Sequence, residues 1–177
     1  DSAGAPVGGA AVTIHPFGDH VYTDVQGRFE GGIEPRSADG GQLIVARDMQ
    51  RGLAAVTQAA GFSRPVEARL GPAWVLAGRI VEPNGAPIPA ARVSLCLNTS
   101  SSLSDLGVEV LTDREGRFEM PAVPPVQEGF AYRLSVAAAG FGPKQYLRIA
   151  PGGPPGTRVD LDPIQLPLAN ESLSGVV

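Results

Sequence analysis

The sequence contains two copies of one pattern, and this internal repeat limits the folds that its 177 residues can adopt. The stretch GAPVGGAAVTI at residues 4–14 matches GAPIPAARVSL at residues 85–95, an offset of 81. The stretch TDVQGRFE at 23–30 matches TDREGRFE at 112–119, an offset of 89. We assign the added residues of the second copy to a loop in the polar tract at 98–105, because loops tolerate insertions.

The repeat continues into the second half of each copy. QLIVA at 42–46 corresponds to RLSVA at 133–137, and VEARLGP at 66–72 corresponds to VDLDPIQLP at 159–167. We therefore expect a first module over residues 1–73, a second module over 74–168 and a separate C-terminal strand over 169–177.

Each copy consists of short β-type runs between turns. The 23 Gly and 17 Pro break the chain too often for long helices. About seven runs in the second copy are alternating or β-rich, among them ARVSLCLN and AYRLSVAA, and the first copy has one fewer. The pattern predicts an all-β protein of two tandem Greek-key β-sandwiches in the immunoglobulin style.

The repeated TDxxGRFE predicts a tight hairpin turn in each copy. Asp24 and Asp113 can accept hydrogen bonds from the backbone ahead of them, and Gly27 and Gly116 can adopt positive φ. The Phe that follows then returns to the core. A calcium site at the same Asp is the alternative, but one Asp per turn supplies too few of the six to eight oxygen ligands that calcium takes.

Composition and charge exclude several classes of function. The net charge of −4 and the lack of a Lys/Arg cluster speak against nucleic-acid binding, and no run of about 18 apolar residues could cross a membrane. Cys96 lies in an alternating run and is expected to be a packed strand residue rather than a catalytic thiol. His15 and His20 flank PFGD in an expected surface loop and have no metal-ligand spacing.

No catalytic, cofactor-binding or metal-binding residues are assigned. The sequence contains no nucleophile elbow, phosphate-binding loop or dinucleotide fingerprint. We therefore do not expect an enzyme, and we expect no cofactor. The segment ARDMQRG at 46–52 is expected to be a solvated hairpin tip; the alternative is an ion pair or a contact with a neighbouring domain.

The second copy resembles a known family. GRIVEPNGAPIPAARVSL, TDREGRFEMPAVPP and YRLSVAAAGF, within residues 75–168, are similar to the carboxypeptidase regulatory-like domain, which is a transthyretin-like β-sandwich. The first copy follows the pattern less closely and departs from it at ARDMQRGLAAV. The resemblance implies a β-sandwich in an extracellular or cell-surface protein and implies no reaction.

One strand is missing from the first copy. The second copy has VLAGRIVEPN before its GAP motif, whereas the first copy begins at DSAGAP. The C-terminal SLSGVV carries the pattern of that same strand. We expect this strand to complete the first module of another molecule by β-augmentation. The expected strand residues are Leu173, Gly175, Val176 and Val177, and the expected acceptor residues are Ala5, Val7, Val12 and Ile14.

These observations favour an extracellular structural protein whose partners are copies of itself, joined head to tail, or adjacent modules of one longer array. The alternative is a carbohydrate- or peptide-binding accessory module of a larger secreted protein. It would use the loop at 98–108 and four aromatic residues, Phe130, Tyr132, Phe141 and Tyr146, most of which are expected in the core.

Two further predictions concern the junction between the modules and glycosylation of the surface. Trp74 is expected at a stiff junction between the modules, because PAWVLAG leaves almost no linker. Two sequons make Asn98 and Asn170 candidate glycosylation sites.

Overall fold

A computed structural model of the chain describes residues 1–15, 19–32, 42–59, 65–98, 103–125, 130–142, 144–149 and 153–169. All regular structure in these ranges is β-strand, so the predicted all-β class is confirmed. Within the same ranges, no helix has the length and apolar character needed to cross a membrane.

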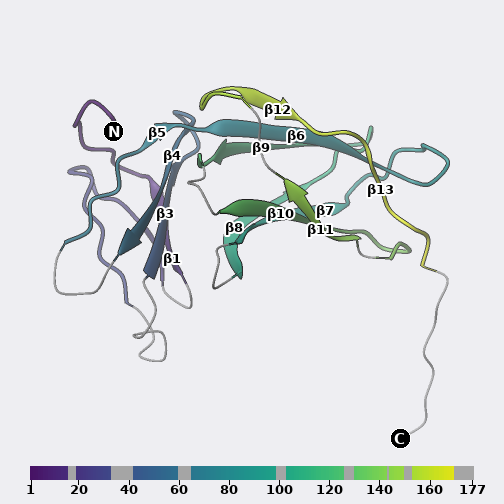
Figure 1. The fold of residues 1–177 in the computed structure, drawn as a ribbon, viewed down its shortest axis with the longest axis horizontal. Helices are drawn as coiled ribbons and strands as arrows, with labels where there is room; N and C mark the ends of the chain where they lie inside the picture. Colours follow the sequence, from purple (N-terminus) through teal and green to yellow (C-terminus); the bar gives the residue numbers. More distant parts are fainter. Residues whose placement is uncertain are drawn as a thin grey trace, which may run out of the picture.

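The N-terminal half contributes one antiparallel sheet. Its strands are β1 (Ala11–His15), β2 (His20–Tyr22), β3 (Gln42–Asp48), β4 (Leu53–Ala59) and β5 (Gly71–Pro72). They lie in the order β2-β1-β3-β4-β5, with β3 in the middle between β1 and β4 (Figure 1). We call residues 1–73 the first module.

The C-terminal half contributes two sheets that pack face to face. One has the order β11-β10-β7-β8, and the other has β6 at its centre, in contact with β9, β12 and β13. Apolar residues of both sheets form one buried cluster, as in a β-sandwich. The strands are β6 (Trp74–Val81), β7 (Arg92–Asn98), β8 (Leu103–Leu111), β9 (Arg117–Val123), β10 (Ala131–Ala137), β11 (Lys144–Ile149), β12 (Arg158–Asp160) and β13 (Ile164–Gln165). We call residues 74–168 the second module.

The sequence repeat produces the same four-stranded sheet twice. The order β2-β1-β3-β4 in the first module corresponds to β8-β7-β10-β11 in the second. Val12 of β1 pairs with Val21 and Ala46, and its counterpart Val93 of β7 pairs with Val110 and Val136.

These ladders correct one part of the predicted alignment. Because Ile14 pairs with Ile44 and Leu95 pairs with Leu134, Ile44 is equivalent to Leu134, whereas the sequence comparison had matched Leu43 to it. The shift of one residue exchanges the two faces of the strand. The error arose because residues 43–46 of β3 are apolar and buried on both faces, so no alternation marks an outer face.

The polar tract at 98–105, assigned as a loop, belongs in part to strands. β7 continues to Asn98 and β8 begins at Leu103, and residues 99–102 lie outside the described residues. The added residues lengthen the β7–β8 hairpin, in which Asn98 pairs with Leu103, and β8 has nine residues where β2 has three.

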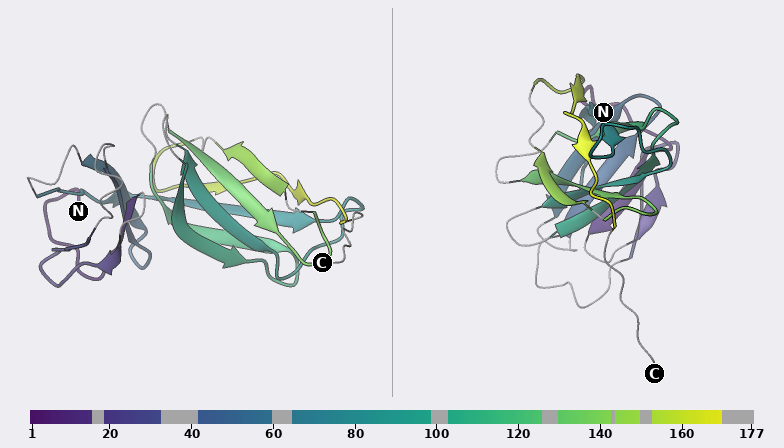
Figure 2. Two further views of the ribbon diagram at one scale, coloured as in Figure 1. Left: turned by 90° about the horizontal axis from the view of Figure 1, so that it is seen from below. Right: turned by 90° about the vertical axis from the view of Figure 1, so that its right-hand side faces the viewer.

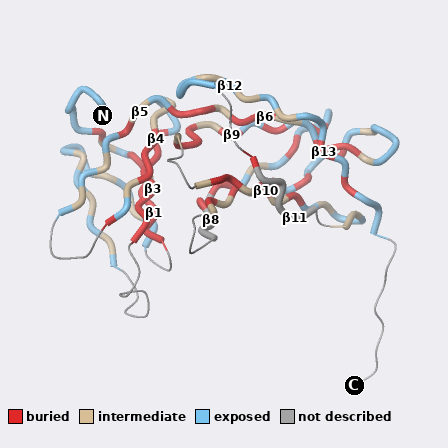
Figure 3. Tube along the Cα trace, in the orientation of Figure 1, coloured by how far each residue is buried: buried red, intermediate tan, exposed pale blue. Residues whose placement is uncertain are grey.

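The two modules lie side by side along the long axis and are joined directly by β5 and β6 (Figure 2). Three apolar side chains of the first sheet, Leu43, Val45 and Val56, belong to the same buried cluster as the core of the second module. Buried positions accordingly run through β1 and β3 as well as β6 (Figure 3). The opposite face of the first sheet packs on a smaller cluster that contains Val12, Ile44, Ala46 and Leu70.

Candidate functional site

The chain begins with a turn that the second module repeats. In the first module, the N-terminal amine of Asp1 donates to Ala5 O (2.7 Å) and Gly4 N donates to Asp1 O (3.0 Å). In the second, Glu82 N donates to Ala86 O (2.8 Å) and Gly85 N to Glu82 O (2.9 Å). Asp1 therefore occupies the position of Glu82, which directly follows β6 in the second module.

The TDxxGRFE turns form as predicted and are nearly superimposable in their hydrogen bonds. Asp24 Oδ1 accepts from Gln26 N and Arg28 N (2.9 and 2.8 Å), and Asp113 Oδ1 accepts from Glu115 N and Arg117 N (3.0 and 2.7 Å). These turns therefore hold the segments that follow them in equivalent positions.

In the second module, the segment after this turn becomes β9 because β6 lies beside it. β6 pairs antiparallel with β9, placing Gly78 opposite Phe118, and parallel with β12, placing Leu76 opposite Val159. Ile80 N donates to Gly116 O (2.7 Å), and Ile80 O accepts from Ile88 N (3.0 Å). β6 is thus the strand that joins all other parts of its sheet.

The first module has the flanking segments without that central strand. Residues 28–32, equivalent to the start of β9, and residues 65–70, equivalent to β12, are not assigned as strands. A groove of about 570 Å³ lies between them. We call it the acceptor groove; its lining residues include Ala5, Val7, Val12, Thr23, Gly27, Phe29, Ala46, Val66, Ala68 and Leu70.

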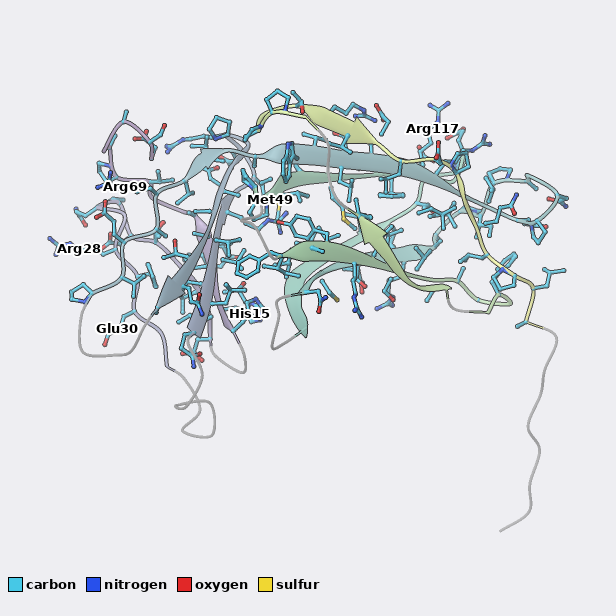
Figure 4. The ribbon with its side chains drawn as sticks, in the orientation of Figure 1. His15, Arg28, Glu30, Met49, Arg69 and Arg117 are labelled. Carbon is cyan, nitrogen blue, oxygen red and sulfur yellow. The ribbon has the colours of Figure 1, made fainter. Side chains whose placement is uncertain are left out.

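One wall of the acceptor groove has the alternation of a strand, and no ladder partner for it is found among the described residues. Val66, Ala68 and Leu70 pack toward the core of the first module, while Glu67 and Arg69 are exposed and form an ion pair (2.8 Å). Figure 4 shows Arg28 and Arg69 at the end of the first module that faces away from the second. A peptide could add to this wall by main-chain hydrogen bonding.

The structure brings most of the predicted acceptor residues to this groove. Ala5, Val7 and Val12 line it, and Ile14 is buried in β1 next to it. Among the described residues, no hydrogen bond is found for Val7 N or Gly27 O, which correspond to the two groups that bond Ile80 in the second module. Leu173, Gly175, Val176 and Val177 lie outside the described residues.

Trp74 lies between the modules. It is 6% exposed, it belongs to the apolar cluster that includes Val45 and Val56, and its Nε1 donates to Pro154 O (3.1 Å). Its contribution to a stiff junction stays a prediction.

The hairpin at 46–52 was wrongly expected to be a solvated tip throughout. Arg47 is 5% exposed and reaches into the second module, where its Nε donates to Ala122 O (2.8 Å) and its Nη2 to Pro121 O. Burial lowers the pKa of Arg47 to about 10, because desolvation disfavours the charged form. Both forms of the alternative are therefore observed: Arg47 contacts the second module, and Arg51 forms an ion pair with Asp48 (3.5 Å).

Other residues singled out from the sequence lie apart from the groove. His15 ends β1 and is buried, not in a surface loop, because that face of the sheet is covered; His20 begins β2 and bonds Thr13 through its Nδ1 (3.0 Å). Cys96 lies in β7, where it is half-buried. The described residues contain no group of three or more potential metal ligands.

The residues of the alternative binding function are mostly core. Tyr132 is fully buried and donates to Pro124 O (2.6 Å), and burial raises the pKa of its phenol. Phe130 and Phe141 pack against the same core, and the side chain of Tyr146 is not described. Asn98 is half-buried at the end of β7, Asn170 lies outside the described residues, and both glycosylation sites stay predictions.

Sequence reasoning missed two parts of the site. It did not identify residues 65–70 as a wall of the groove, although their alternation of apolar and charged residues was a usable signal. It also did not identify Phe29 as a lining residue of the groove, because the repeated motif indicated only that this side chain returns to the core.

No curated protein matches the chain in sequence. Similar solved structures include catechol 1,2-dioxygenase from Pseudomonas arvilla C-1, with 16% identity, 57% of this chain and 54% of that chain covered, and a TM-score of 0.42. A streptococcal ancillary pilin has 12% identity, coverages of 93% and 59% and a TM-score of 0.44. The pilus 2b backbone protein of group B streptococcus has 11% identity, coverages of 96% and 83% and a TM-score of 0.43. The chain thus spans less than two thirds of the first two of these proteins.

A family comparison gives a more specific result. Residues 75–162 match the carboxypeptidase regulatory-like domain, which is the family that the repeated motifs had indicated. The match begins at the second residue of β6 and ends just after β12, so it contains both sheets of the sandwich except β13. The second module of this chain is a carboxypeptidase regulatory-like domain.

Proposed function

We propose that the chain is a structural subunit of the cell exterior that assembles head to tail. In this assembly, residues 171–177 of one molecule occupy the acceptor groove of the next and complete its second sheet. The assembly is non-closing and propagates as a filament, because the donor and acceptor are different surfaces.

The observation that carries the proposal is the place of the acceptor groove. It lies over the first sheet where β6 lies over the equivalent sheet of the second module, between the segments equivalent to β9 and β12. A strand in the groove would meet apolar side chains of Val12 and Ala46 on one face and extended backbone on both edges. Strand addition to such edges is a recurrent mode of peptide recognition.

The arrangement of the molecule favours exchange between molecules. The groove faces away from the second module, and β13 lies at the opposite end of the chain's long axis (Figure 1). Because β13 runs parallel to the last residues of β6, residues 166–169 continue away from the first module. To return, the tail would have to pass along β6, about 26 Å at about 3.3 Å per residue. Residues 170–177 span at most about 28 Å when fully extended, so they would be used up along β6 and could not also fill the groove.

Truncation of residues 171–177 tests the proposal. We expect the full chain to form polymers whose size increases with concentration, and the truncated chain to remain a monomer in sedimentation velocity. A synthetic peptide of residues 171–177 should bind the truncated chain and protect β1 and β3 from hydrogen exchange, because bound ligand stabilises the folded state. A peptide of the same composition with its order scrambled is the control.

Two results would contradict the proposal: polymers of the truncated chain like those of the full chain, or a full chain that stays monomeric at every concentration. Assemblies from the native source should also separate into single chains on a denaturing gel. A ladder of larger polypeptides would show that the same junction is covalent in a longer array. Protease shaving of intact cells tests the location, since a surface assembly should be removed.

A further inference from the structure

The geometry of the second module points to the register of the strand in the groove. We infer that Gly175 of one molecule lies across the ring of Phe29 of the next, with Leu173 and Val177 on either side facing the first sheet. This inference rests on the proposed function and adds its residue-level recognition, in which a single glycine selects the register.

Gly78 shows why a glycine is required at the centre of β6. A Cβ atom at Gly78 would lie 2.8 Å from Cε1 and 2.9 Å from Cζ of Phe118, closer than real Cβ contacts come. Phe118 is opposite Gly78 in the ladder and is 4% exposed, so it covers the strand directly. A side chain at the strand position that the ring crosses would therefore force the buried ring to shift.

Phe29 is the counterpart of Phe118 in the first module, but no glycine of a central strand lies against it among the described residues. It follows the same Asp–Gly turn as Phe118, packs on the core of the first module and lines the acceptor groove, where it is partly buried. Because both turns make the same hydrogen bonds, Phe29 leaves the turn in the same direction as Phe118. A strand in the groove must then present a residue without a side chain to Phe29.

Residues 171–177 contain one glycine, and its neighbours fit the same register. Leu76, Gly78 and Ile80 alternate along β6, and both apolar side chains are almost completely buried. In the tail, Leu173, Gly175 and Val177 have the same spacing and the same order of large, absent and β-branched side chains. Any shift by one residue would place Ser174 or Val176 against the ring.

In this register the backbone groups of the added strand also meet hydrogen-bonding groups of the groove. Val177 takes the place of Ile80, so its N–H would donate to Gly27 O and its carbonyl would accept from Val7 N. The strand would run antiparallel to residues 27–30 and parallel to residues 66–70, as β6 runs relative to β9 and β12. Its C-terminal end would therefore lie beside Asp1 of the acceptor molecule.

The test compares two neighbouring alanine substitutions in the full chain by sedimentation velocity over a concentration series. Gly175→Ala should weaken assembly about tenfold, or by about 1.4 kcal/mol, because the added Cβ atom would have to displace the ring of Phe29. Ser174→Ala is the matched control and should change assembly by less than about twofold, because the equivalent residue of β6 is Ala77.

Repeating the Gly175→Ala substitution in a Phe29→Ala variant isolates the contact between Gly175 and the ring. In Phe29→Ala, which removes the ring, adding Gly175→Ala should cost less than about twofold, because the two substitutions act on one contact. An equal loss in both backgrounds would overturn the register. Assembly of Gly175→Ala at the wild-type level would also overturn it. The proposed function would stand in both cases if removal of residues 171–177 still abolished assembly, and would fail with the register if it did not.

Discussion

The two modules have equivalent first sheets, but only the second module has a second sheet built around a central strand. This difference shows what a single strand contributes. Four strands of the first module's sheet have the same order as the four-stranded sheet of the second module, with closely matching ladders. Only the second module has β6, and only there are β9, β12 and β13 assigned as strands. The equivalent segments of the first module keep their turns and their apolar residues but pair with no strand in the part of the chain that the structure describes. A central strand therefore organises the whole second layer.

The outer faces of the two equivalent sheets differ as well. β3 presents Leu43 and Val45 to the second module, whereas the equivalent positions of β10 are Arg133 and Ser135. The same framework can therefore be a buried interface in one copy and a more polar surface in the other.

The largest expected difference between the modules concerns the two equivalent phenylalanines. Phe118→Ala should destabilise the second module by about 3–5 kcal/mol, the usual cost of removing a buried Phe. Phe29→Ala should cost the unassembled first module only about 1 kcal/mol, because the ring is partly exposed without a covering strand. Urea unfolding, with hydrogen exchange reporting each sheet separately, measures both. Equal losses would mean that the groove is already filled in the monomer.

The two turn glycines should give the next largest difference. Gly116 and Gly27 both have positive φ, 73° and 72°, so alanine is strained at either site. At Gly116 a Cβ would also lie 2.5 Å from Ile80 O, whereas the nearest atom at Gly27 is Val7 N at 3.0 Å. Gly116→Ala should therefore cost about 3 kcal/mol and Gly27→Ala about 2 kcal/mol. In thermal unfolding, a larger effect at Gly27 than at Gly116 would contradict the comparison.

Much of this comparison could be predicted from the sequence, because identical sequence motifs predict identical local structure. The TDxxGRFE turns and the strand between GAP and the next turn depend on glycine and aspartate positions that any copy must keep. The expectation that the first copy lacks a strand rested on its comparison with the second copy. The match of Asp1 to Glu82, now visible in the hydrogen bonds, follows from the same alignment.

The errors came from tertiary contacts, which a single sequence does not show. β3 has apolar residues on both faces because the second module covers one of them, so its register was misaligned by one residue. Arg47 was expected at a solvated tip because arginine is rarely buried. The bonds from Arg47 to the backbone of β9 depend on a contact between residues more than 70 positions apart in the sequence.

The third prediction compares the threonines of the two TD motifs. Thr112 Oγ1 donates to Ile88 O (2.7 Å) and accepts from Ala91 N (2.8 Å), and Thr23 Oγ1 makes the equivalent bonds with Val7 O and Ala10 N. Thr112→Val should cost about 2 kcal/mol, because it leaves two buried groups unpaired. Thr23→Val should cost about 1 kcal/mol, because its bonds are only partly buried. Denaturant midpoints of the two variants measure the difference, and a larger loss at Thr23 would contradict it.

The smallest effect is expected where the modules meet, at Arg47. Arg47→Met leaves the carbonyls of Pro121 and Ala122 without their donor, and such unpaired groups cost about 1–3 kcal/mol. The same change removes a desolvated charge, which offsets part of that loss. We therefore expect a net destabilisation of about 1 kcal/mol. Arg51→Met is the control from the same hairpin, since that side chain is exposed and only ion-pairs with Asp48 at 3.5 Å. Hydrogen exchange should increase in β3 and β9 together in the Arg47 variant and in neither strand in the Arg51 variant. An increase confined to β3 would show that the contact stabilises the first module alone and does not couple the two.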